Sequence, residues 1–481
     1  MMIKDSRLLN DKFEYTGKWN LPGNSEHIAY GTLKYDNGSI SLKISGSLQD
    51  EPEPKSIIEY LQQLRSHRFD TILGITDEGI EITLEDCIWT HRSGGGTGSQ
   101  SSQITTYHVN TMFVGVQYGG LKNIKFNNVT VKYTNFKEWI NESGITTDQN
   151  LEEGKFTINS ETPESHKGHL IDDFDYNIFH HVDNPGHHQD RFDATIKQDT
   201  LISITSKNKH EYSEFHKLHY RLQNFFMLCI GYSIRPLLIT ASMDDIKGKI
   251  ILIYQSSVDV SGNHAPIRND QMILTFKDLN EKEESVFQNW LTSYKDLEDA
   301  FDLYFENFTN SNLYPQDRFE NVIQALEAFH RRRFDDELLE RIRYDTMIKH
   351  ILSKISEQDA IDWINSQRSL GNNLSLPQKL HQLFEQFPYL YKNVEKREEF
   401  VRDVRDTRNY FAHHTPELKK KAAESAPLAY LEQRLNVLMD ACMLSELHYD
   451  EDELEKLVIK FAKRRQLVKI VGTPDPYEWL V

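Results

Sequence analysis

Hydrophobic and polar residues alternate along the first part of the chain in the pattern that predicts β-strands. Residues 33–44 alternate on both sides of the turn Asp36-Asn37-Gly38, and Asn-Gly readily adopts positive φ angles, so this segment predicts a hairpin. Residues 72–84 repeat the pattern around Asp77-Glu78-Gly79 and predict a second hairpin. Further strands are expected at residues 107–116, 129–133, 249–254 and 272–276.

The second part of the chain changes to helical spacing. Apolar residues recur at intervals of three and four and predict helices over residues 287–308, 319–329, 380–384, 400–411 and 428–442, with one earlier helix over 215–229. The pattern therefore predicts an α+β multidomain protein. A β-rich region at residues 1–280 would precede an all-α bundle at residues 285–470. A polar stretch between residues 141 and 190 predicts a linker or a subdomain border.

Length and composition narrow the class of protein. A chain of 481 residues is expected to form two or three domains. No apolar run is long enough to cross a membrane, and the first residues lack a signal-peptide core, so we expect a cytoplasmic protein without a membrane partner. The three cysteines, Cys87, Cys229 and Cys442, are far apart and are expected to be buried thiols rather than disulfides or zinc ligands.

The net charge of −18 restricts any contact with nucleic acid to a local patch. One such patch exists between Arg402 and Lys421, a segment that contains six basic residues and three acidic ones. An ordinary solvated helix face is the alternative interpretation of that count.

The segment VRDVRDTRNYFAHH at residues 401–414 carries the clearest chemical signal. Arg408, which is always charged, lies five residues before His413, which can exchange a proton near neutral pH. On an ideal helix a five-residue offset places two side chains about 140° apart, so the pair needs a helix end or a second copy of the chain to meet. Thr415 and Pro416 are typical of a helix start, which predicts that the preceding helix ends near His413.

These groups suggest the cleavage of an RNA phosphodiester bond. His413 would act as general base or general acid, Arg408 would neutralise charge on the phosphate, and Asn409 would orient one of the two. Arg405 and His414 are expected to contact RNA. No acidic cluster for Mg²⁺ accompanies the motif, so a metal-independent cut giving a 2′,3′-cyclic phosphate, with no cofactor, is expected. The alternative is structural: an arginine paired with Asp403 or Asp406, and a histidine that favours the helix C-terminus.

Several segments together resemble a known family. The motif lies in a helical C-terminal region, after an ALEAFH-like helix at residues 325–330. The β-rich region opens with GKWNLPG at residues 17–23 and YGTLKY at residues 30–35, and FHKLHYRLQNFFMLCIGYSIRP follows at residues 215–236. In this order the segments resemble the ApeA-like HEPN proteins of bacterial anti-phage abortive infection.

The resemblance implies a function, partners and site residues. The family's catalytic arginine, polar residue and histidine fall on Arg408, Asn409 and His413. It implies a toxic endoribonuclease that cleaves cellular RNA, with tRNA as one candidate, at the interface of a homodimer. The N-terminal region would sense infection, with a phage-derived protein as the trigger. The alternative is a non-catalytic HEPN module that binds nucleotides or other proteins.

Three further motifs have plainer interpretations. The histidines around His180 and His188, with His166 and His169 upstream, could bind a metal, but a solvated loop of surface histidines fits their spacing better. The glycine-rich segment at residues 93–99 lacks the Lys-Ser/Thr of a phosphate-binding loop and predicts a flexible turn. The basic segment Arg331-Arg332-Arg333 could contact RNA, or it could form a charged helix end that Asp335, Asp336 and Glu337 balance. The same two interpretations apply to Lys463-Arg464-Arg465.

Overall fold

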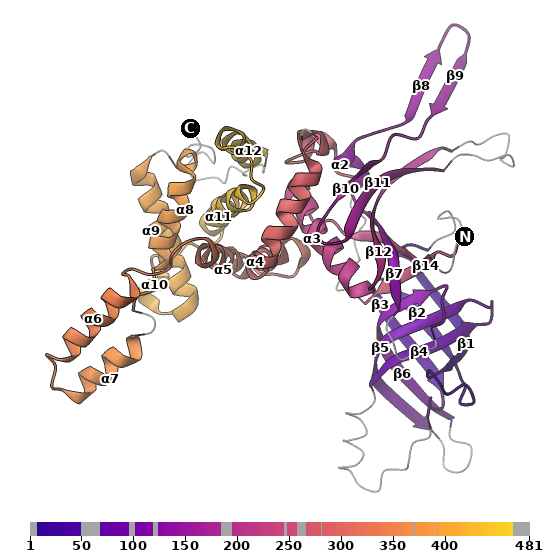
Figure 1. The fold of residues 1–481 in the computed structure, drawn as a ribbon, viewed down its shortest axis with the longest axis horizontal. Helices are drawn as coiled ribbons and strands as arrows, with labels where there is room; N and C mark the ends of the chain where they lie inside the picture. Colours follow the sequence, from indigo (N-terminus) through magenta and orange to yellow (C-terminus); the bar gives the residue numbers. More distant parts are fainter. Residues whose placement is uncertain are drawn as a thin grey trace. The chain divides into compact units, whose positions relative to one another are not determined.

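The computed structural model describes residues 7–49, 68–95, 102–118, 124–183, 195–244, 248–256, 266–279, 281–368, 371–391 and 393–464. The chain divides into two compact units. The first consists of Met1–Phe226, Ile234–Asp270 and Thr275–Lys277, and the second of Met227–Ser233, Gln271–Leu274 and Asp278–Val481. The strands belong to the first unit, and all helices from residue 283 onward belong to the second (Figure 1). The predicted fold class, a β-rich N-terminal region followed by a helical bundle, is therefore confirmed.

One sheet of twelve strands forms the framework of the N-terminal unit. The strands are β1 (Lys12–Asn20), β2 (Ala29–Asp36), β3 (Ser39–Ser45), β4 (Arg68–Thr76), β5 (Glu81–Gly95), β6 (Ser102–Val114), β7 (Lys125–Tyr133), β10 (His166–His169), β11 (Phe174–Asp183), β12 (Lys197–Glu211), β13 (Pro236–Ser242) and β14 (Ile251–Gln255). Their order across the sheet is β10-β11-β12-β7-β13-β14-β6-β3-β2-β1-β4-β5. A separate hairpin joins β8 (Ile145–Asn150) and β9 (Lys155–Ser160).

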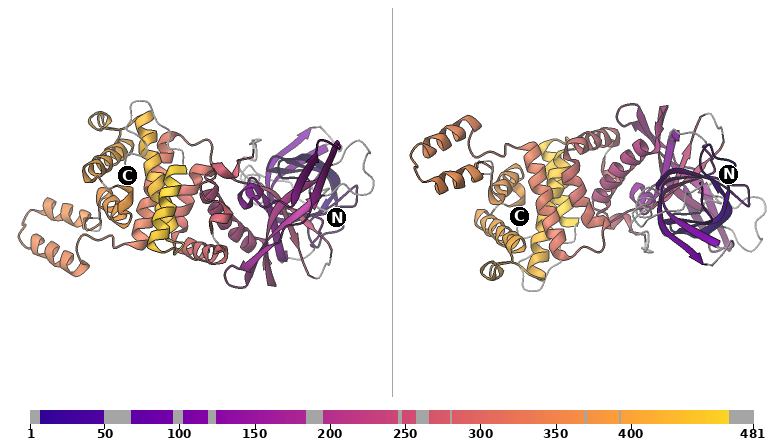
Figure 2. Two further views of the ribbon diagram at one scale, coloured as in Figure 1. Left: turned by 90° about the horizontal axis from the view of Figure 1, so that it is seen from above. Right: turned by 90° about the horizontal axis from the view of Figure 1, so that it is seen from below.

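The first six strands close into a ring because β5 pairs with β6 as well as with β4 (Figure 2, right). β6 connects the ring to the rest of the sheet. Its residues Ile104–His108 pair with β3, whereas its residues Thr111–Val114 pair with β14. Alternate residues of β1 are buried, as expected for a strand with one face toward the interior of the ring.

Helix α3 (Tyr212–Ile230) packs on β7 of this sheet. His219 approaches the carbonyl oxygen of Val129 through Nε2 at 3.0 Å, and the Tyr133 hydroxyl lies 3.3 Å from His219 Nδ1. The short helix α2 (Phe136–Ile140) adds the fully buried Trp139 to the same core. The helix predicted over residues 215–229 is thus confirmed, and it ends at Gly231, where φ is +84°.

Both predicted hairpins are confirmed. Asn37 and Gly38 have φ angles of 48° and 81°, the positive values that a tight hairpin turn needs between β2 and β3. Gly79 has a φ of 80° in the turn between β4 and β5. The strands expected at residues 107–116, 129–133 and 249–254 correspond to β6, β7 and β14.

Two sequence-based expectations for this region were wrong. The polar stretch at residues 141–190, expected to be a linker or border, contains β8, β9, β10 and β11. The β8–β9 hairpin projects from the sheet and exposes side chains such as Leu151 and Phe156, so it shows no alternation between a buried and a solvated face. Residues 272–276, expected to be a strand, form none. Their apolar side chains are buried in a turn in which the Leu274 N–H donates to the carbonyl of Cys229 at 2.8 Å.

The second unit is helical. Its helices are α4 (Glu283–Thr309), α5 (Pro315–Arg333), α6 (Arg341–Leu352), α7 (Gln358–Gln367), α8 (Leu376–Gln386), α9 (Val394–His413), α10 (Pro416–Lys419), α11 (Ala426–Ser445) and α12 (Glu451–Arg464). The five helices predicted for this region are confirmed as α4, α5, α8, α9 and α11. Helices α6, α7 and α12 were not predicted.

The core of the helical unit lies among α4, α5 and α11. Trp290 and Phe301 stack within α4 with ring centroids 4.9 Å apart, and the Tyr304 hydroxyl donates to the buried Asp440 carboxylate on α11 at 2.7 Å. Helix α9 joins this core through Phe411, whose ring meets Phe319 of α5 edge to face at 6.0 Å. This packing fixes the helix that bears the Arg–His motif.

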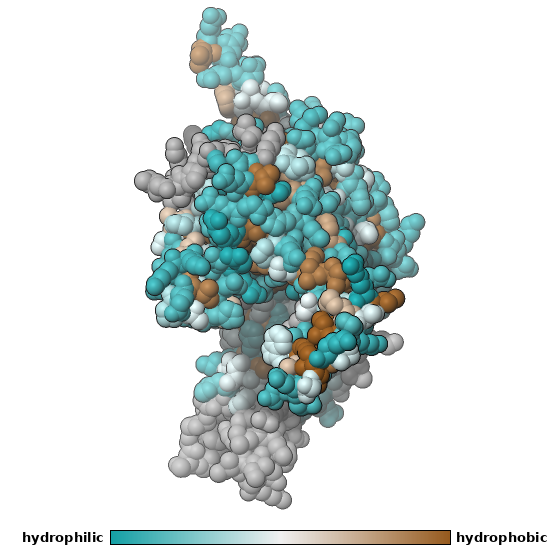
Figure 3. All heavy atoms as spheres, turned by 90° about the vertical axis from the view of Figure 1, so that its left-hand side faces the viewer, coloured by the Kyte–Doolittle hydropathy of each residue, from teal (hydrophilic) through white to brown (hydrophobic). Residues whose placement is uncertain are grey.

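Helices α6 and α7 extend from the rest of the helical unit (Figure 1). Apolar side chains are visible on the face of Figure 3, and the exposed ones from this segment are Leu338, Ile342, Met347, Ile351 and Trp363. No helix among the described residues is both long and apolar enough to cross a membrane. Cys87, Cys229 and Cys442 are buried and free, as predicted, and burial raises the pKa of each thiol.

Candidate active site

Helix α9 carries the Arg–His motif and has defined ends. The Asn393 side chain caps its start by accepting a hydrogen bond from the Lys396 N–H at 3.1 Å. Its last residue is His413, and His414 follows with a left-handed φ of 53°. The His414 N–H donates to the Tyr410 carbonyl at 2.7 Å, and Thr415 and Pro416 then begin α10. The predicted helix end near His413 is confirmed.

Arg408 is half-buried on α9 and makes no ion pair or side-chain hydrogen bond with any residue in the described part of the chain. The two nearby carboxylates are engaged elsewhere. Asp406 accepts from Arg405 Nε at 2.8 Å, and Asp403 lies 3.9 Å from Arg402 Nε. The structural alternative for Arg408, a surface ion pair with Asp403 or Asp406, is therefore contradicted. A guanidinium without an internal partner is available to bind an anion.

His413 is exposed in the last turn of α9, and Arg408 does not contact it. Because the helix continues through both residues, their side chains diverge by about 140° around its axis. Arg405 and Asn409 occupy the arc between them, and the exposed Ala412 lies in the same arc. One chain therefore presents the arginine and the histidine at opposite edges of one open surface.

The remaining predicted site residues have distinct environments. Asn409 is half-buried and, within the described residues, hydrogen-bonds through its side chain to neither Arg408 nor His413, so the single chain does not contain the orienting contact expected of it. Arg405 is exposed, and its guanidinium pairs with Asp406. His414 is exposed at the helix cap, with its ring edge toward Tyr410 at a centroid distance of 5.6 Å.

The loop that follows α9 folds back and forms a hydrogen bond with α9. We did not predict this contact from the sequence. The backbone N–H of Ala423 donates to the hydroxyl of Thr407 at 2.9 Å, across sixteen residues. Thr407 is fully buried and immediately precedes Arg408. The apolar spacing of α9 is enough to predict that Thr407 is buried. It is not enough to identify Ala423, sixteen residues later, as the partner of its hydroxyl.

The described histidines of the predicted cluster lie on strands of the N-terminal unit rather than in a loop, contrary to expectation. His180 lies on β11 with a buried side chain, and its Nε2 is 3.2 Å from Glu142 Oε2. His166, on β10, contacts the same carboxylate at 3.0 Å. Burial lowers the pKa of His180, while Glu142 opposes that shift. No group of three or more ligand-type side chains among the described residues has the geometry of a metal site, and His188 lies outside them.

The arginines at the end of α5 match the structural interpretation. Arg333 donates to both oxygens of Glu446, at 2.7 and 2.8 Å, while Arg331 and Arg332 lie 3.6 and 3.7 Å from Asp336 and Asp299. All three are thus balanced by carboxylates. The glycine-rich segment begins at the end of β5, but residues 96–99 lie outside the described residues, as does Arg465.

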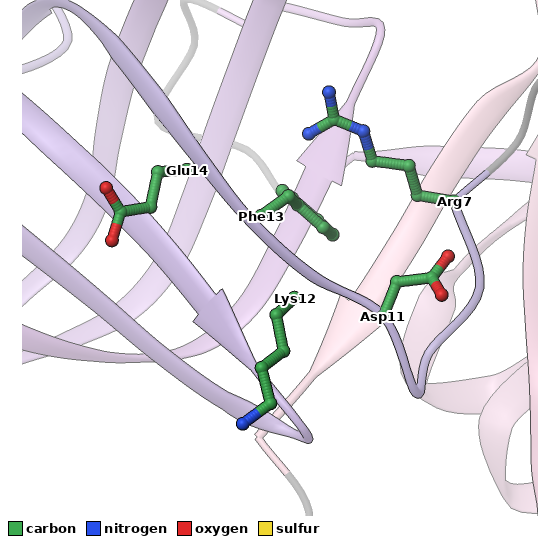
Figure 4. Close-up of a pocket in the computed structure, with 5 residues that line it drawn as sticks. All are labelled: Arg7, Asp11, Lys12, Phe13 and Glu14. Carbon is green, nitrogen blue, oxygen red and sulfur yellow. The ribbon is translucent and has the colours of Figure 1, made fainter.

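A shallow depression in the N-terminal unit is lined by Arg7, Asp11, Lys12, Phe13 and Glu14 (Figure 4). The Arg7 guanidinium lies over the Phe13 ring at 4.8 Å, and Lys12 pairs with Asp36 at 2.9 Å. Charges of both signs surround this open depression, whereas six basic residues exceed three acidic ones between residues 402 and 421.

Comparison with protein-family models identifies both units as parts of a known class. Residues 14–290 match ApeA N-terminal domain 1, and residues 320–453 match the Apea-like HEPN domain. The chain is therefore a HEPN protein, and it belongs to the ApeA-like HEPN family. HEPN domains are generally ribonucleases, and the family is consistent with an anti-phage effector. Comparisons with curated proteins and with solved structures gave no match.

Proposed function

We propose that this chain is a metal-independent endoribonuclease that cleaves cellular RNA, tRNA being one candidate, as a toxic effector in anti-phage abortive infection. The observation that carries the proposal is the state of Arg408 on α9: its guanidinium is half-buried and has no partner among the described residues. A guanidinium without an internal partner is free to bind the charged phosphate of a substrate.

The chemistry follows from the groups. His413 removes the proton of a ribose 2′-hydroxyl, whose oxygen attacks the adjacent phosphorus while the bond to the 5′-oxygen breaks. The leaving 5′-oxygen takes a proton from solvent water, and the protonated His413 then returns its proton to solvent. Arg408 neutralises the charge that builds on the non-bridging oxygens. The products are a 2′,3′-cyclic phosphate and a 5′-hydroxyl.

The proposed active unit is a homodimer. Within one chain Arg408 and His413 diverge on α9, so a phosphate cannot easily meet both residues of the same helix. A two-fold dimer that brings two copies of α9 together would place the arginine of one chain near the histidine of the other. Asn409, Arg405 and His414 would then face the shared cleft and contact RNA or the catalytic pair. The N-terminal unit would sense infection, with a phage-derived protein as trigger.

Cleavage of total RNA by the purified full-length protein tests the proposal. Arg408→Ala and His413→Ala should each abolish cleavage while circular dichroism shows an intact fold. Arg402→Ala, on the same helix, and His350→Ala, on α6, are matched controls that should cleave like the parent. Equal cleavage by all four variants would contradict the assignment. A parent that never cleaves, with or without phage lysate, would favour a non-catalytic HEPN module, the class to which the acidic overall charge is better suited.

A further inference from the structure

The segment between α9 and α11 forms a closed, basic loop beside the motif. After the left-handed cap at His414, α10 turns the chain, and the N–H groups of Lys421 and Ala422 both donate to the Leu418 carbonyl, at 3.0 and 3.1 Å. The next residue, Ala423, is bound to Thr407 of α9 at 2.9 Å. The loop therefore begins and ends on the last two turns of α9, the part of the helix that carries Arg408 and His413.

Three consecutive lysines, Lys419, Lys420 and Lys421, are exposed on this loop. None has an ion pair with a described residue, whereas Arg402 and Arg405 on α9 face Asp403 and Asp406. The basic excess between residues 402 and 421 thus resides mainly in Arg408 and the three lysines, offset by the exposed Glu417. In a chain with a net charge of −18, such a concentration of free ammonium groups is a local anion-binding surface.

We propose that Lys419, Lys420 and Lys421 bind the RNA backbone next to the scissile phosphate, and that the Thr407–Ala423 hydrogen bond holds them there. The proposal rests on the ribonuclease function above and names how its substrate is held. Flexible ammonium groups contact phosphates as point charges and read no base, so this loop supplies affinity and register rather than sequence choice. Thr407 is a positioning residue: it touches no substrate but fixes the loop relative to Arg408.

Binding and cleavage are measured separately to test this. Binding uses the full-length His413→Ala protein, a labelled single-stranded oligoribonucleotide and fluorescence anisotropy at several salt concentrations. Replacing the three lysines by alanine in that background should weaken binding on the order of tenfold and reduce the slope of log K against log salt by about 2, since each lost phosphate contact contributes about 0.7. The matched control, Arg343→Ala with Lys349→Ala and Lys354→Ala on and after α6, removes equal charge and should leave both values unchanged.

Thr407→Val tests the hydrogen bond. It preserves the side-chain volume but removes the acceptor for Ala423, so it should lower the salt slope although all three lysines remain, and Thr407→Ser should restore it. An unchanged salt slope in the triple-lysine variant would overturn the proposal, as would a parent that binds no RNA. Lysine-dependent binding by a chain that never cleaves RNA would support the loop and overturn the proposed catalytic function, so the two failures are distinguishable.

Discussion

Arg408 and His413 lie on one uninterrupted helix, five residues apart, and face directions about 140° apart around its axis. This separation is a property of the helix, because α9 ends only after His413. Two copies of such a helix related by a two-fold axis can place complementary edges opposite each other. The catalytic mechanism therefore depends on whether the arginine and the histidine of one active site come from the same chain or from two chains.

Mixing two inactive variants tests that question. Arg408→Ala and His413→Ala should each be inactive alone. After subunit exchange in equal amounts, half of the dimers are mixed, and each mixed dimer holds one site with an intact arginine and an intact histidine from different chains. Cleavage should return to about one quarter of the parent rate. Mixing Arg408→Ala with the double variant Arg408→Ala/His413→Ala is the control and should restore nothing. Continued inactivity in the first mixture would contradict the composite site.

The identity of the nucleophile gives a second prediction. If His413 activates the ribose 2′-hydroxyl, a substrate with a single 2′-deoxy nucleotide at the mapped cleavage site should resist cutting at that site by more than about a hundredfold. Cleavage of the unmodified substrate should continue in EDTA and leave 2′,3′-cyclic phosphate ends, read by end-specific ligation. Efficient cutting of the deoxy substrate, or complete inhibition by EDTA that added Mg²⁺ reverses, would contradict the mechanism.

Much of the fold follows from local sequence signals. The turn at Asn37-Gly38 requires positive φ angles, which both residues adopt, and Pro315 and Pro416 begin helices as their fixed φ favours. Helices α6 and α7 were not predicted because α6 buries only Tyr344 and Ile348, and α7 buries no residue. An amphipathic pattern identifies a helix only where it has a core to face.

The site was partly predictable for a related reason. The residues that end α9 and start α10 are adjacent in sequence, so the position of His413 at a helix end could be predicted. The link between Thr407 and Ala423 depends on a loop path that no local pattern specifies. The contact between Arg405 and Asp406 depends on side-chain rotamers, which the sequence does not specify either. Similarly, His180 was assigned to a loop although it lies on β11, because its pairing partner β12 is contributed by a later part of the chain.

An ion pair between a buried lysine and a half-buried aspartate supports the helical unit near the end of α5. Lys379 on α8 is 3% exposed, and its ammonium group lies 2.9 Å from Asp336 Oδ1. Among the described residues, Asp336→Ala would leave that charge with only Glu327, at 3.9 Å, and should lower the free energy of unfolding by about 3 kcal/mol. Asp362→Ala, on the exposed face of α7, is the matched control and should change it by less than about 0.5 kcal/mol. Urea unfolding measures both, and equal effects of the two variants would contradict the assigned role of the pair.

His219 should make the N-terminal unit sensitive to acid. Burial lowers the pKa of His219 to about 4, and its neutral ring donates from Nε2 to the Val129 carbonyl while Nδ1 faces the Tyr133 hydroxyl. An unfolded histidine has a pKa of about 6.5, so between these values the unfolded chain binds a proton that the folded chain does not. Stability is therefore fully present above about pH 6.5 and should fall by about 3 kcal/mol as the pH drops to about 4.

His219→Gln removes this titration while keeping an amide that can bond to Val129. The variant should lose less stability than the parent between about pH 7 and about pH 4.5, whereas the exposed control His350→Gln should follow the parent. Hydrogen exchange of β7 and α3 peptides across a urea series reports the N-terminal unit without interference from the helical one. The same pH dependence in His219→Gln and the parent would show that other groups govern the acid response. A shallower dependence confined to His219→Gln would assign it to the buried imidazole between α3 and β7.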